Sequence, residues 1–293
     1  MQKLKKYKNK RYFFFIFVFI SVFPIFTFAH QPRIPDSNQT VVLDPEISKA
    51  YYAKLSGDPQ VYTISSDKAF NLYVNILVPD IADQKKDVNL ALFKKNGQSS
   101  TADELLTIFD NGNNNWEKFF EPFGYDSYWK GAEYRQAVPA GNYEIRIWSS
   151  NNDSKYVLAV GEKESFPLKE TLRTVKLIPE IKKNFFNESP INFILSPIGW
   201  GFVLVVFILA FIIGFIFRLL VRKIAKRKNR TTTRNIGKTD RIFRAILGLA
   251  LFLIAISTSW SPILLFLAGF MLFEAIFSWC GFYAAVGKNT CPR

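Results

Sequence analysis

Two cysteines near the end of the chain are the residues most able to react as nucleophiles. Cys280 and Cys291 are the only cysteines among 293 residues. A thiolate close to basic residues is more reactive than an ordinary thiol, so this thiol pair could have a chemical function. Alternatively, Cys280 is simply a small apolar residue. One unbroken helix would hold the two residues about 16 Å apart, and Gly287 would let the tail fold back to close that gap.

A carboxylate inside an apolar stretch is the second candidate. Glu274 would cost roughly 2.5–3.5 kcal/mol as a charged group in the middle of a membrane span. We therefore expect it to face a helix–helix interface and not lipid. Its partner would be Ser257 or Thr258 of a facing helix, or Glu274 of a second copy. Gly269 and Gly281 would permit close approach. A structural hydrogen bond is the simpler role, and a proton or solute site is the alternative.

An aromatic cluster is the third candidate. Residues 116–134 are crowded with Trp, Tyr and Phe. Aromatic rings stack on sugar faces or anchor protein contacts. We therefore predict a ligand-binding loop built from Trp116, Tyr125, Tyr128 and Trp129. The alternative is that these rings cap the core under a long loop, because Phe is mostly buried in proteins.

The composition excludes several kinds of catalytic and metal site. The chain has one His, so a Ser-His-Asp triad would have to use His30, and one chain cannot supply a multi-His metal site. Copper binding by a terminal His30 would need a second His. Asp126 and Glu133 could form a glycosidase acid pair, but no motif surrounds them. The three carboxylates Asp80, Asp83 and Asp87 lack the spacing of a calcium loop. We expect no metal, no cofactor and no catalytic residue, and hence no enzyme.

The net charge of +14 is concentrated in two short blocks, residues 1–11 and 218–244, each beside an apolar run. Lys and Arg are enriched on the cytoplasmic side of membrane spans, so basic blocks beside apolar runs indicate a membrane protein. A nucleic-acid-binding protein would more often spread basic residues over a folded face, so no nucleic acid partner is expected. The second block could alternatively bind anionic lipid headgroups specifically.

The first 29 residues have the pattern of a signal peptide. A basic start is followed by uncharged residues 12–29, which end in small residues, so we predict cleavage after Ala29. The alternative is an uncleaved anchor, because 18 uncharged residues can just cross a bilayer. In both cases the following region, residues 30–166, is exported.

The exported region has short runs of alternating apolar and polar residues between turn clusters, for example at residues 88–93 and 143–148. This period indicates antiparallel sheets with one buried face. We predict about seven strands in an all-β, jelly-roll-like sandwich. The segment VPAGNYEIRI at residues 138–147, followed by 156–160, resembles the closing hairpin of bacterial pre-peptidase C-terminal β-sandwiches. That resemblance implies an accessory or binding domain.

Three transmembrane helices are expected after this domain. Residues 167–197, which contain Pro179 and Pro190, are predicted to form a partly extended stalk. Residues 198–217 are predicted to form the first span. This helix would run from the outside to the cytoplasm, because the basic loop 218–240 follows it. Residues 241–293 form a hairpin with apolar segments 245–257 and 263–285, in which Arg241 and Arg244 snorkel. Its C-terminus, with both cysteines, would lie in the cytoplasm.

Two motifs of the hairpin resemble a known family. They are Asn235-x-Gly237-x-x-Asp240-Arg241-x-x-Arg244-x-x-x-Gly248 and Cys280-x-x-Tyr283-x-x-x-Gly287-x-x-Thr290-Cys291-Pro292. Residues 235–293 resemble the YgaP-like inner-membrane transmembrane domain. The chain departs from the family at Gly281, where Pro is usual, and lacks the rhodanese domain of some members. The resemblance implies a two-helix membrane hairpin that is often paired with another copy.

These observations together predict a mixed fold, an exported β-sandwich followed by three membrane helices, in a bacterial inner membrane. The expected function is non-catalytic binding or sensing in the cell envelope, with a protein or glycan as ligand. The alternative is a sulfur-related thiol function or a small-solute function of the hairpin at the cytoplasmic face. The expected partners are the lipid bilayer, that envelope ligand, and a second copy bound through the hairpin.

Overall fold

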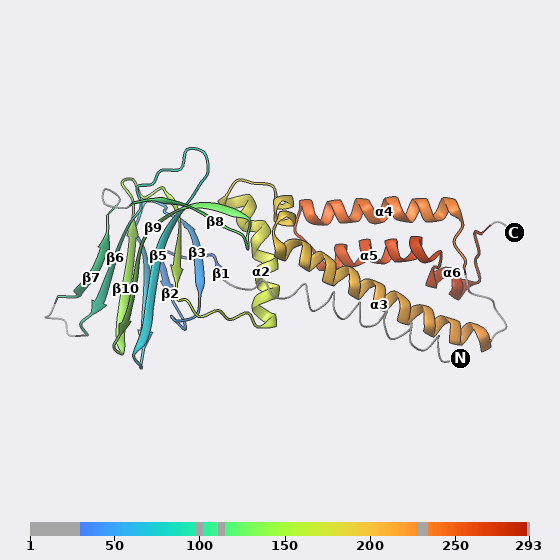
Figure 1. Ribbon diagram of the computed structural model, residues 1–293, viewed down its shortest axis with the longest axis horizontal. Coiled ribbons are helices and arrows are strands. Elements are labelled where there is room, and N and C mark those ends of the chain that lie inside the picture. Colours follow the sequence, from blue (N-terminus) through green and yellow to red (C-terminus); the bar gives the residue numbers. More distant parts are fainter. Residues whose placement is uncertain (1–29, 98–101, 111–114, 228–233, 292–293) are drawn as a thin grey trace, which may run out of the picture. The chain divides into compact units, whose positions relative to one another are not determined.

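The computed structural model describes residues 30–97, 102–110, 115–227 and 234–291. The predicted signal peptide lies outside these ranges. The chain divides into two compact units, Met1–Leu177 and Ile178–Arg293, called here the β unit and the helical unit (Figure 1). They are described separately.

The β unit contains two sheets (Figure 1). The six-stranded sheet has the order β1-β3-β11-β5-β9-β8, and the five-stranded sheet has the order β2-β4-β10-β6-β7. The strands of the first sheet are β1 (Gln31–Arg33), β3 (Lys49–Lys54), β11 (Lys155–Val160), β5 (Phe70–Pro79), β9 (Asp126–Val138) and β8 (Glu117–Glu121). Those of the second are β2 (Gln39–Val41), β4 (Gln60–Ser66), β10 (Gly141–Trp148), β6 (Asn89–Lys95) and β7 (Glu104–Phe109).

The strands form where the sequence alternates. In β10, Tyr143, Ile145 and Ile147 are buried while the residues between them are more exposed. They belong to a single hydrophobic core to which strands of both sheets contribute. Its polar atoms are paired, since the hydroxyl oxygens of Tyr62 and Tyr156 lie 3.0 Å apart. The predicted β-rich, sandwich-like domain is therefore present.

The aromatic segment is a β-hairpin and not the long loop that we expected. Strands β8 and β9 pair antiparallel, with Phe119 opposite Tyr128. A short turn joins them, and Tyr125 in this turn adopts a left-handed conformation with φ of 63°. Alternating side chains of paired strands point to opposite faces. The aromatic side chains are thus distributed over two faces and do not cap the core together.

The predicted stalk is helical and not partly extended. It contains α2 (Leu168–Glu180), η1 (Ile181–Phe185) and η2 (Pro190–Leu195). Its prolines lie where helices tolerate them. Pro179 is in the last turn of α2, and Pro190 begins η2, where its missing N–H would be unpaired in any case. The Ser189 hydroxyl caps η2 by accepting a hydrogen bond from the N–H of Ile191.

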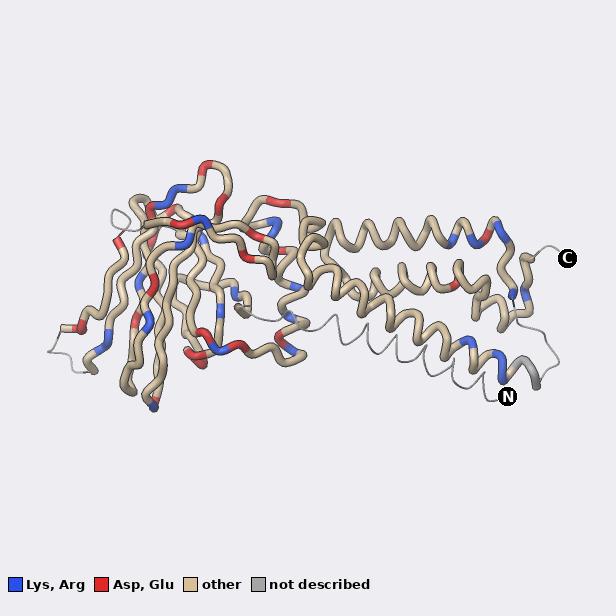
Figure 2. Tube along the Cα trace, in the orientation of Figure 1, with Lys and Arg blue, Asp and Glu red and all other residues tan. Residues whose placement is uncertain are grey.

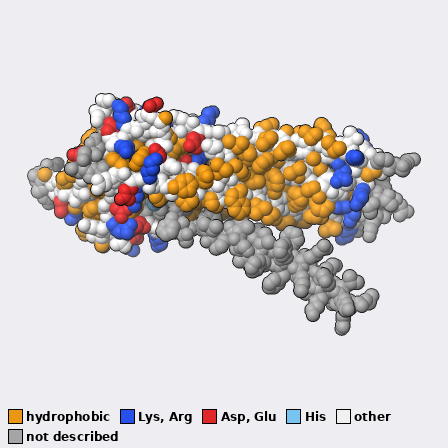
Figure 3. All heavy atoms as spheres, turned by 45° about the horizontal axis from the view of Figure 1, so that its top comes forward, with side chains coloured by type: hydrophobic (Ala, Val, Ile, Leu, Met, Phe, Trp, Pro, Cys, Tyr) orange, Lys and Arg blue, Asp and Glu red, His pale blue; other side chains and the backbone are white. Residues whose placement is uncertain are grey.

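The helical unit contains four further helices, α3 (Pro197–Arg227), α4 (Lys238–Ser257), α5 (Pro262–Phe277) and α6 (Gly281–Val286). Among the helices of the described ranges, α3 alone is long and apolar enough to cross a membrane, over Pro197–Ile224. Figure 2 shows Lys and Arg gathered near one end of the unit, while the lengths of α3, α4 and α5 carry few charges. Figure 3 shows hydrophobic side chains over most of the visible surface of these helices.

The predicted single helix over residues 263–285 is broken. Ser278 adopts a left-handed conformation with φ of 51° and ends α5. Cys280 is extended and precedes α6. Trp279 between them is fully buried. The apolar run could not reveal this break, because hydropathy does not report a change of backbone conformation.

Close packing joins α5 to both α3 and α4. Gly214 of α3 lies against the Phe273 ring, and an added Cβ there would be 2.7 Å from that ring. Gly269 of α5 lies against Ala210 of α3 in the same way. Small residues let helices approach this closely in membranes. Helix α3 therefore packs as a third helix on the predicted two-helix hairpin.

Candidate functional site

Glu274 faces another helix, as its position in an apolar run predicts. It is 3% exposed and forms an ion pair with Arg244 of α4. Arg244 Nε also donates to Asp240 Oδ1 at 3.1 Å, one helical turn earlier. Residues four apart lie on one face of a helix, so α4 presents this pair of charges to α5.

The prediction that Ser257 or Thr258 is the partner of Glu274 is wrong. Ser257 and Thr258 end α4, whereas Glu274 lies near the end of α5 and meets the beginning of α4. The Thr258 hydroxyl donates instead to the Ile254 carbonyl at 2.7 Å. Arg244 does not act only as a snorkelling residue, because a carboxylate lies within reach inside the interface.

The side chain of Asn235 holds the break between α5 and α6. Its Oδ1 accepts from the Cys280 N–H at 2.8 Å, and its Nδ2 donates to the Cys280 carbonyl at 2.9 Å. The Asn235 N–H donates to the Ser278 carbonyl at 3.1 Å. A buried backbone that leaves the helix needs such substitute partners. The first motif thus stabilises the bend that begins the second.

Thr290 of the second motif forms hydrogen bonds with residues of the first motif. The Thr290 N–H donates to the Asn235 carbonyl at 3.1 Å, and the Gly237 N–H donates to the Thr290 hydroxyl at 2.9 Å. That hydroxyl lies 3.2 Å from Asp240 Oδ2. An added Cβ on Gly237 would be 2.1 Å from the Thr290 carbonyl oxygen, so this position requires glycine. We call Asn235, Asp240, Arg244, Glu274, Cys280 and Thr290 the motif network.

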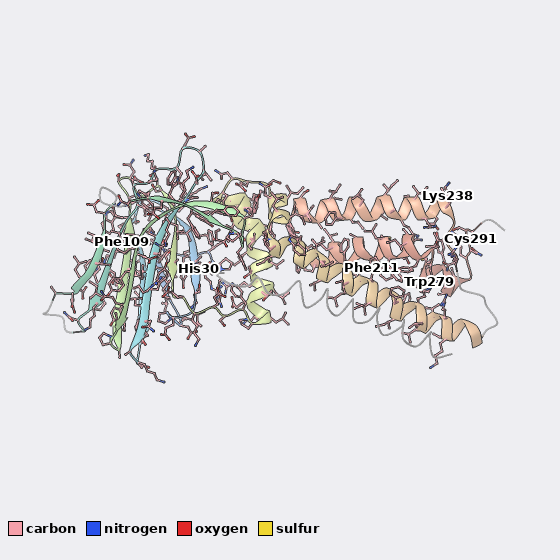
Figure 4. All side chains as sticks on the ribbon, in the orientation of Figure 1. His30, Phe109, Phe211, Lys238, Trp279 and Cys291 are labelled. Carbon is pink, nitrogen blue, oxygen red and sulfur yellow. The ribbon has the colours of Figure 1, made fainter. Side chains whose placement is uncertain are left out.

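The two cysteines have different environments. Cys280 is buried, Cys291 is half-buried, and both are free thiols. The Cys280 thiol lies near the Glu274 carboxylate, which is paired with Arg244. The tail folds back after Gly287, which ends α6 with φ of 77° as its residue type allows. Figure 4 shows Cys291 at the same end of the helical unit as Trp279.

The structure separates the four predicted aromatic ligands. Trp116 and Trp129 pack against the sandwich core. Tyr128 is buried, and its hydroxyl oxygen lies 3.2 Å from that of Tyr52. Burial raises the pKa of both tyrosines, so both stay protonated. Of the four residues, Tyr125 alone is exposed, so they do not form one binding surface.

Two phenylalanines that the sequence did not single out are exposed instead. Phe119 and Phe120 of β8 are 40% and 49% exposed. The rings of Phe120 and Tyr125 meet edge to face with centroids 5.2 Å apart. Because Phe is usually buried, such residues are not recognised in a sequence; the charged residues that flank them in the short strand Glu117–Glu121 are the signal that could have found them. We call Phe119, Phe120 and Tyr125 the hairpin-tip aromatics.

Trp129 is covered on its outer side by cations. Lys86 Nζ lies 3.8 Å and Lys118 Nζ 4.9 Å from the ring centroid. The indole N–H donates to Asp80 Oδ1 at 2.9 Å, and Lys118 also pairs with Asp80 at 3.2 Å. An indole held in this way has no open face for a sugar ring.

The carboxylates and His30 have local partners. Glu133 pairs with Lys130 at 3.0 Å, and this hydrogen bond holds the pKa of Glu133 below its ordinary value, which opposes a general-acid role. His30 Nδ1 contacts the Ser48 hydroxyl. Burial lowers the His30 pKa to about 4, so the ring is neutral at pH 7. Within the described ranges, three or more His, Cys, Asp and Glu side chains do not gather into a metal site.

A cavity of about 500 Å³ lies in the β unit beside β1, β3 and α2. Two of its basic residues have partners within the protein. Arg33 pairs with Glu170 at 2.9 Å. Lys49 Nζ donates to the carbonyls of Leu43 and Asp44 at 2.7 and 2.8 Å, and burial lowers its pKa to about 8. We therefore find no distinct ligand chemistry there.

Comparison with known families identifies the helical hairpin. Residues 232–293 match the family model described as "Inner membrane protein YgaP-like, transmembrane domain". The match contains both motifs and the whole motif network but not α3. The predicted resemblance is confirmed for this part of the chain. A search of curated proteins found no match.

Solved structures give only a weak likeness. The pre-peptidase C-terminal domain of collagenase from Bacillus anthracis is 11% identical, over 43% of this chain and 95% of that chain, with a TM-score of 0.25. The copper-binding protein CorA from Methylomicrobium album BG8 is 8% identical, over 46% and 100%, with a TM-score of 0.24. Eiger TNF from S. frugiperda is 10% identical, over 42% and 97%, with a TM-score of 0.20. At these scores the likeness supports no functional argument.

Proposed function

We propose that this protein is a multi-pass protein of the bacterial inner membrane, whose β unit is an exported, non-catalytic module that binds or senses an envelope ligand. The YgaP-like match and the apolar length of α3 support the membrane location. The basic residues that follow α3 favour a cytoplasmic position for its end. Helices α4 and α5 would then be the second and third spans, with α6 and the motif network at the cytoplasmic side.

The observation that carries the binding role is the free edge of the five-stranded sheet. Among the described residues, strand β7 is the last strand of that sheet and pairs with β6 alone. It exposes Leu105 and Ile108, which lie opposite Phe93 and Ala91 of β6 on one face. An edge strand with unpaired backbone groups and apolar side chains is a template for an added strand.

This edge favours an extended protein segment as ligand over a glycan. The Arg146 guanidinium lies 4.8 Å from the Phe93 ring, which extends the apolar surface beside β7. An added strand would gain main-chain hydrogen bonds from β7 and contacts with alternate side chains. By contrast, the predicted glycan platform is divided, because Trp116 packs on the core and lysines cover Trp129.

Photo-crosslinking in cells tests this proposal. A photoreactive amino acid at Ile108 should capture a defined envelope protein. The control is Val41, an exposed residue on β2 at the opposite edge of the same sheet. Leu105→Lys should abolish capture at position 108 without lowering the amount of protein. Equal capture at positions 41 and 108, or none at position 108, would contradict strand addition at β7.

A second candidate function rests on Cys280. Its thiol lies near the Glu274 carboxylate of the motif network, which is paired with Arg244. The function would be thiol or small-solute chemistry at the cytoplasmic face. Alkylation of intact membranes should then modify Cys280 about as fast as Cys291. Modification of Cys280 only after denaturation would show that the thiol is structural. Both thiols should be reduced in growing cells.

A further inference from the structure

We propose that one corner of the β unit binds the lipid headgroup region of the membrane that anchors the chain. The corner consists of the hairpin-tip aromatics and the first two turns of α2. This inference rests on the proposed membrane anchoring but not on the proposed role of β7. It assigns the exposed rings to a lipid surface and not to a soluble ligand.

The hairpin tip exposes aromatic rings on both of its faces. Three rings, Phe119, Phe120 and Tyr125, are each at least 40% exposed. Two of them are in edge-to-face contact, with Phe120 and Tyr125 centroids 5.2 Å apart. Exposed aromatic rings gathered at one site indicate an interaction surface. Aromatic side chains are enriched at the boundary between lipid and water, where such rings sit at headgroup level.

The first turns of α2 supply an apolar stripe. Leu168 and Leu172 are 76% and 53% exposed, and they lie one helical turn apart on the same side. Thr174, on the other side of the helix, is buried, and Val175, one turn after Leu172 on the same side, is buried too, so the exposed stripe ends there. An amphipathic helix with exposed leucines on a separate stripe can lie in the plane of a membrane surface with that stripe in the headgroup region.

Charge favours a membrane as the occupant over an apolar protein groove. The acidic residue in these turns of α2, Glu170, is already paired with Arg33. The exposed charged residues of this part of α2 that have no ion pair in the structure are all basic: Lys169, Arg173 and Lys176. Lys and Arg near an anionic lipid surface add to the attraction. The basic residues beside β7, in contrast, are paired, Lys94 with Glu104 and Lys95 with Asp103.

The two surfaces meet at the point where the chain leaves the β unit. Phe123 in the hairpin turn packs on Phe166, with ring centroids 5.7 Å apart. Phe166 precedes α2 by two residues. The 13 residues of α2 span only about 20 Å, and the first membrane helix begins at Pro197. A tether this short keeps the corner at a high effective concentration near the bilayer, so even a weak lipid contact would be occupied.

Spin labels on the full chain in nanodiscs test this inference. Phe120→Cys and Leu168→Cys are labelled in a background in which both native cysteines are replaced by alanine. Ile108→Cys on β7 is the control, since it is an equally exposed apolar residue. We expect the ratio of oxygen to nickel-chelate collisions to be several-fold higher at positions 120 and 168 than at 108. A ratio at 120 and 168 equal to that at 108 would overturn the proposal.

A second measurement avoids substitutions altogether. An amine-reactive reagent is applied to the native chain in nanodiscs of phosphatidylcholine, with or without phosphatidylglycerol. Lys169 and Lys176 should react several-fold more slowly when the anionic lipid is present, while exposed Lys68 and Lys85 should be unaffected. Equal reaction rates of Lys169 and Lys176 in both lipid mixtures, together with collision ratios at positions 120 and 168 equal to that at 108, would rule out docking of this corner on the membrane. If crosslinking at β7 fails while Lys169 and Lys176 still react more slowly in anionic lipid, the proposed ligand binding is refuted and the membrane contact is not.

Discussion

The two units place the same residue types in opposite environments. In the β unit, Leu90, Leu92 and Ile145 are fully buried in the sandwich core. In the helical unit, α4 exposes apolar residues such as Phe243, Ile246 and Leu249 along its length. The helical unit also buries the polar side chains of Asn235 and Glu274 beneath this apolar surface. This inversion is the one expected when the surroundings change from water to lipid.

The contrast shows that different forces stabilise the two units. Removal of apolar surface from water can drive the sandwich together. Helices already surrounded by lipid gain little from that effect and depend on close packing and internal polar contacts. Accordingly, Gly214 and Gly269 form tight contacts between α3 and α5, and the motif network joins both ends of the hairpin. The predictions below test this difference.

The largest effect concerns topology and is all or none. A reporter fused after Arg293 should be active only in the cytoplasm, whereas a reporter fused after residue 166 should be active only outside it. The basic residues 218–244 dictate this orientation. Reporter enzymes that require one compartment provide the measurement. An exported reporter after Arg293 would refute the model of three spans.

The next largest effect concerns the buried ion pair. Arg244→Leu should destabilise the helical unit by about 3–5 kcal/mol, because it leaves the Glu274 carboxylate buried without its cation. Glu274→Leu should be similarly harmful. The double variant should recover much of the loss, since two apolar side chains then share the interface. Thermal unfolding in detergent and abundance in membranes are measured, and a double variant worse than either single one would contradict the pairing.

Matched leucine substitutions test the inversion directly. Leu90→Ala in β6 should destabilise the β unit by about 2–5 kcal/mol, because this side chain is 0% exposed. Leu249→Ala in α4, where the side chain is 54% exposed, should change thermal stability much less. Equal losses would show that α4 is covered by a further partner, such as a second copy of the chain.

The smallest effect concerns glycine packing. An added Cβ on Gly281 would collide with the Phe217 ring, so Gly281→Ala should cost about 1–3 kcal/mol. Gly201→Ala is the control, because no atom lies within 4 Å of an added Cβ there. Phe217→Ala should relieve the defect of Gly281→Ala. If Gly281→Ala changes dimerisation of the chain but not its thermal stability, Gly281 packs against a second copy of the chain and not against α3.

The small residues Gly269 and Gly281 lie at points of close helix contact, as their lack of bulk predicts. In the structure, Ala210 of α3 fills the space beside Gly269, and Phe217 of α3 fills the space beside Gly281. The sequence identifies such residues as contact points because they lack bulk. It does not reveal which helix fills the space, since that depends on how the three helices pack together.

The sequence by itself determined the classes of element and the family of the hairpin. Alternation with period two predicted the strands, uninterrupted apolar runs predicted the helices, and residue spacing in two motifs predicted the YgaP-like domain. These signals are local, so they can be read without knowing what each residue touches. The prediction of a partly extended stalk over residues 167–197 was wrong, because its prolines were interpreted as breaks in helical structure.

Tertiary structure alone decided which residues meet. Arg244 reaches Glu274 across 30 positions, and Asn235 reaches Cys280 across 45. The four predicted aromatic residues separate because β8 and β9 pair as strands and turn alternate rings to opposite faces. Contacts between distant positions arise only when the chain folds, since side chains far apart in sequence leave no periodic pattern that would pair them.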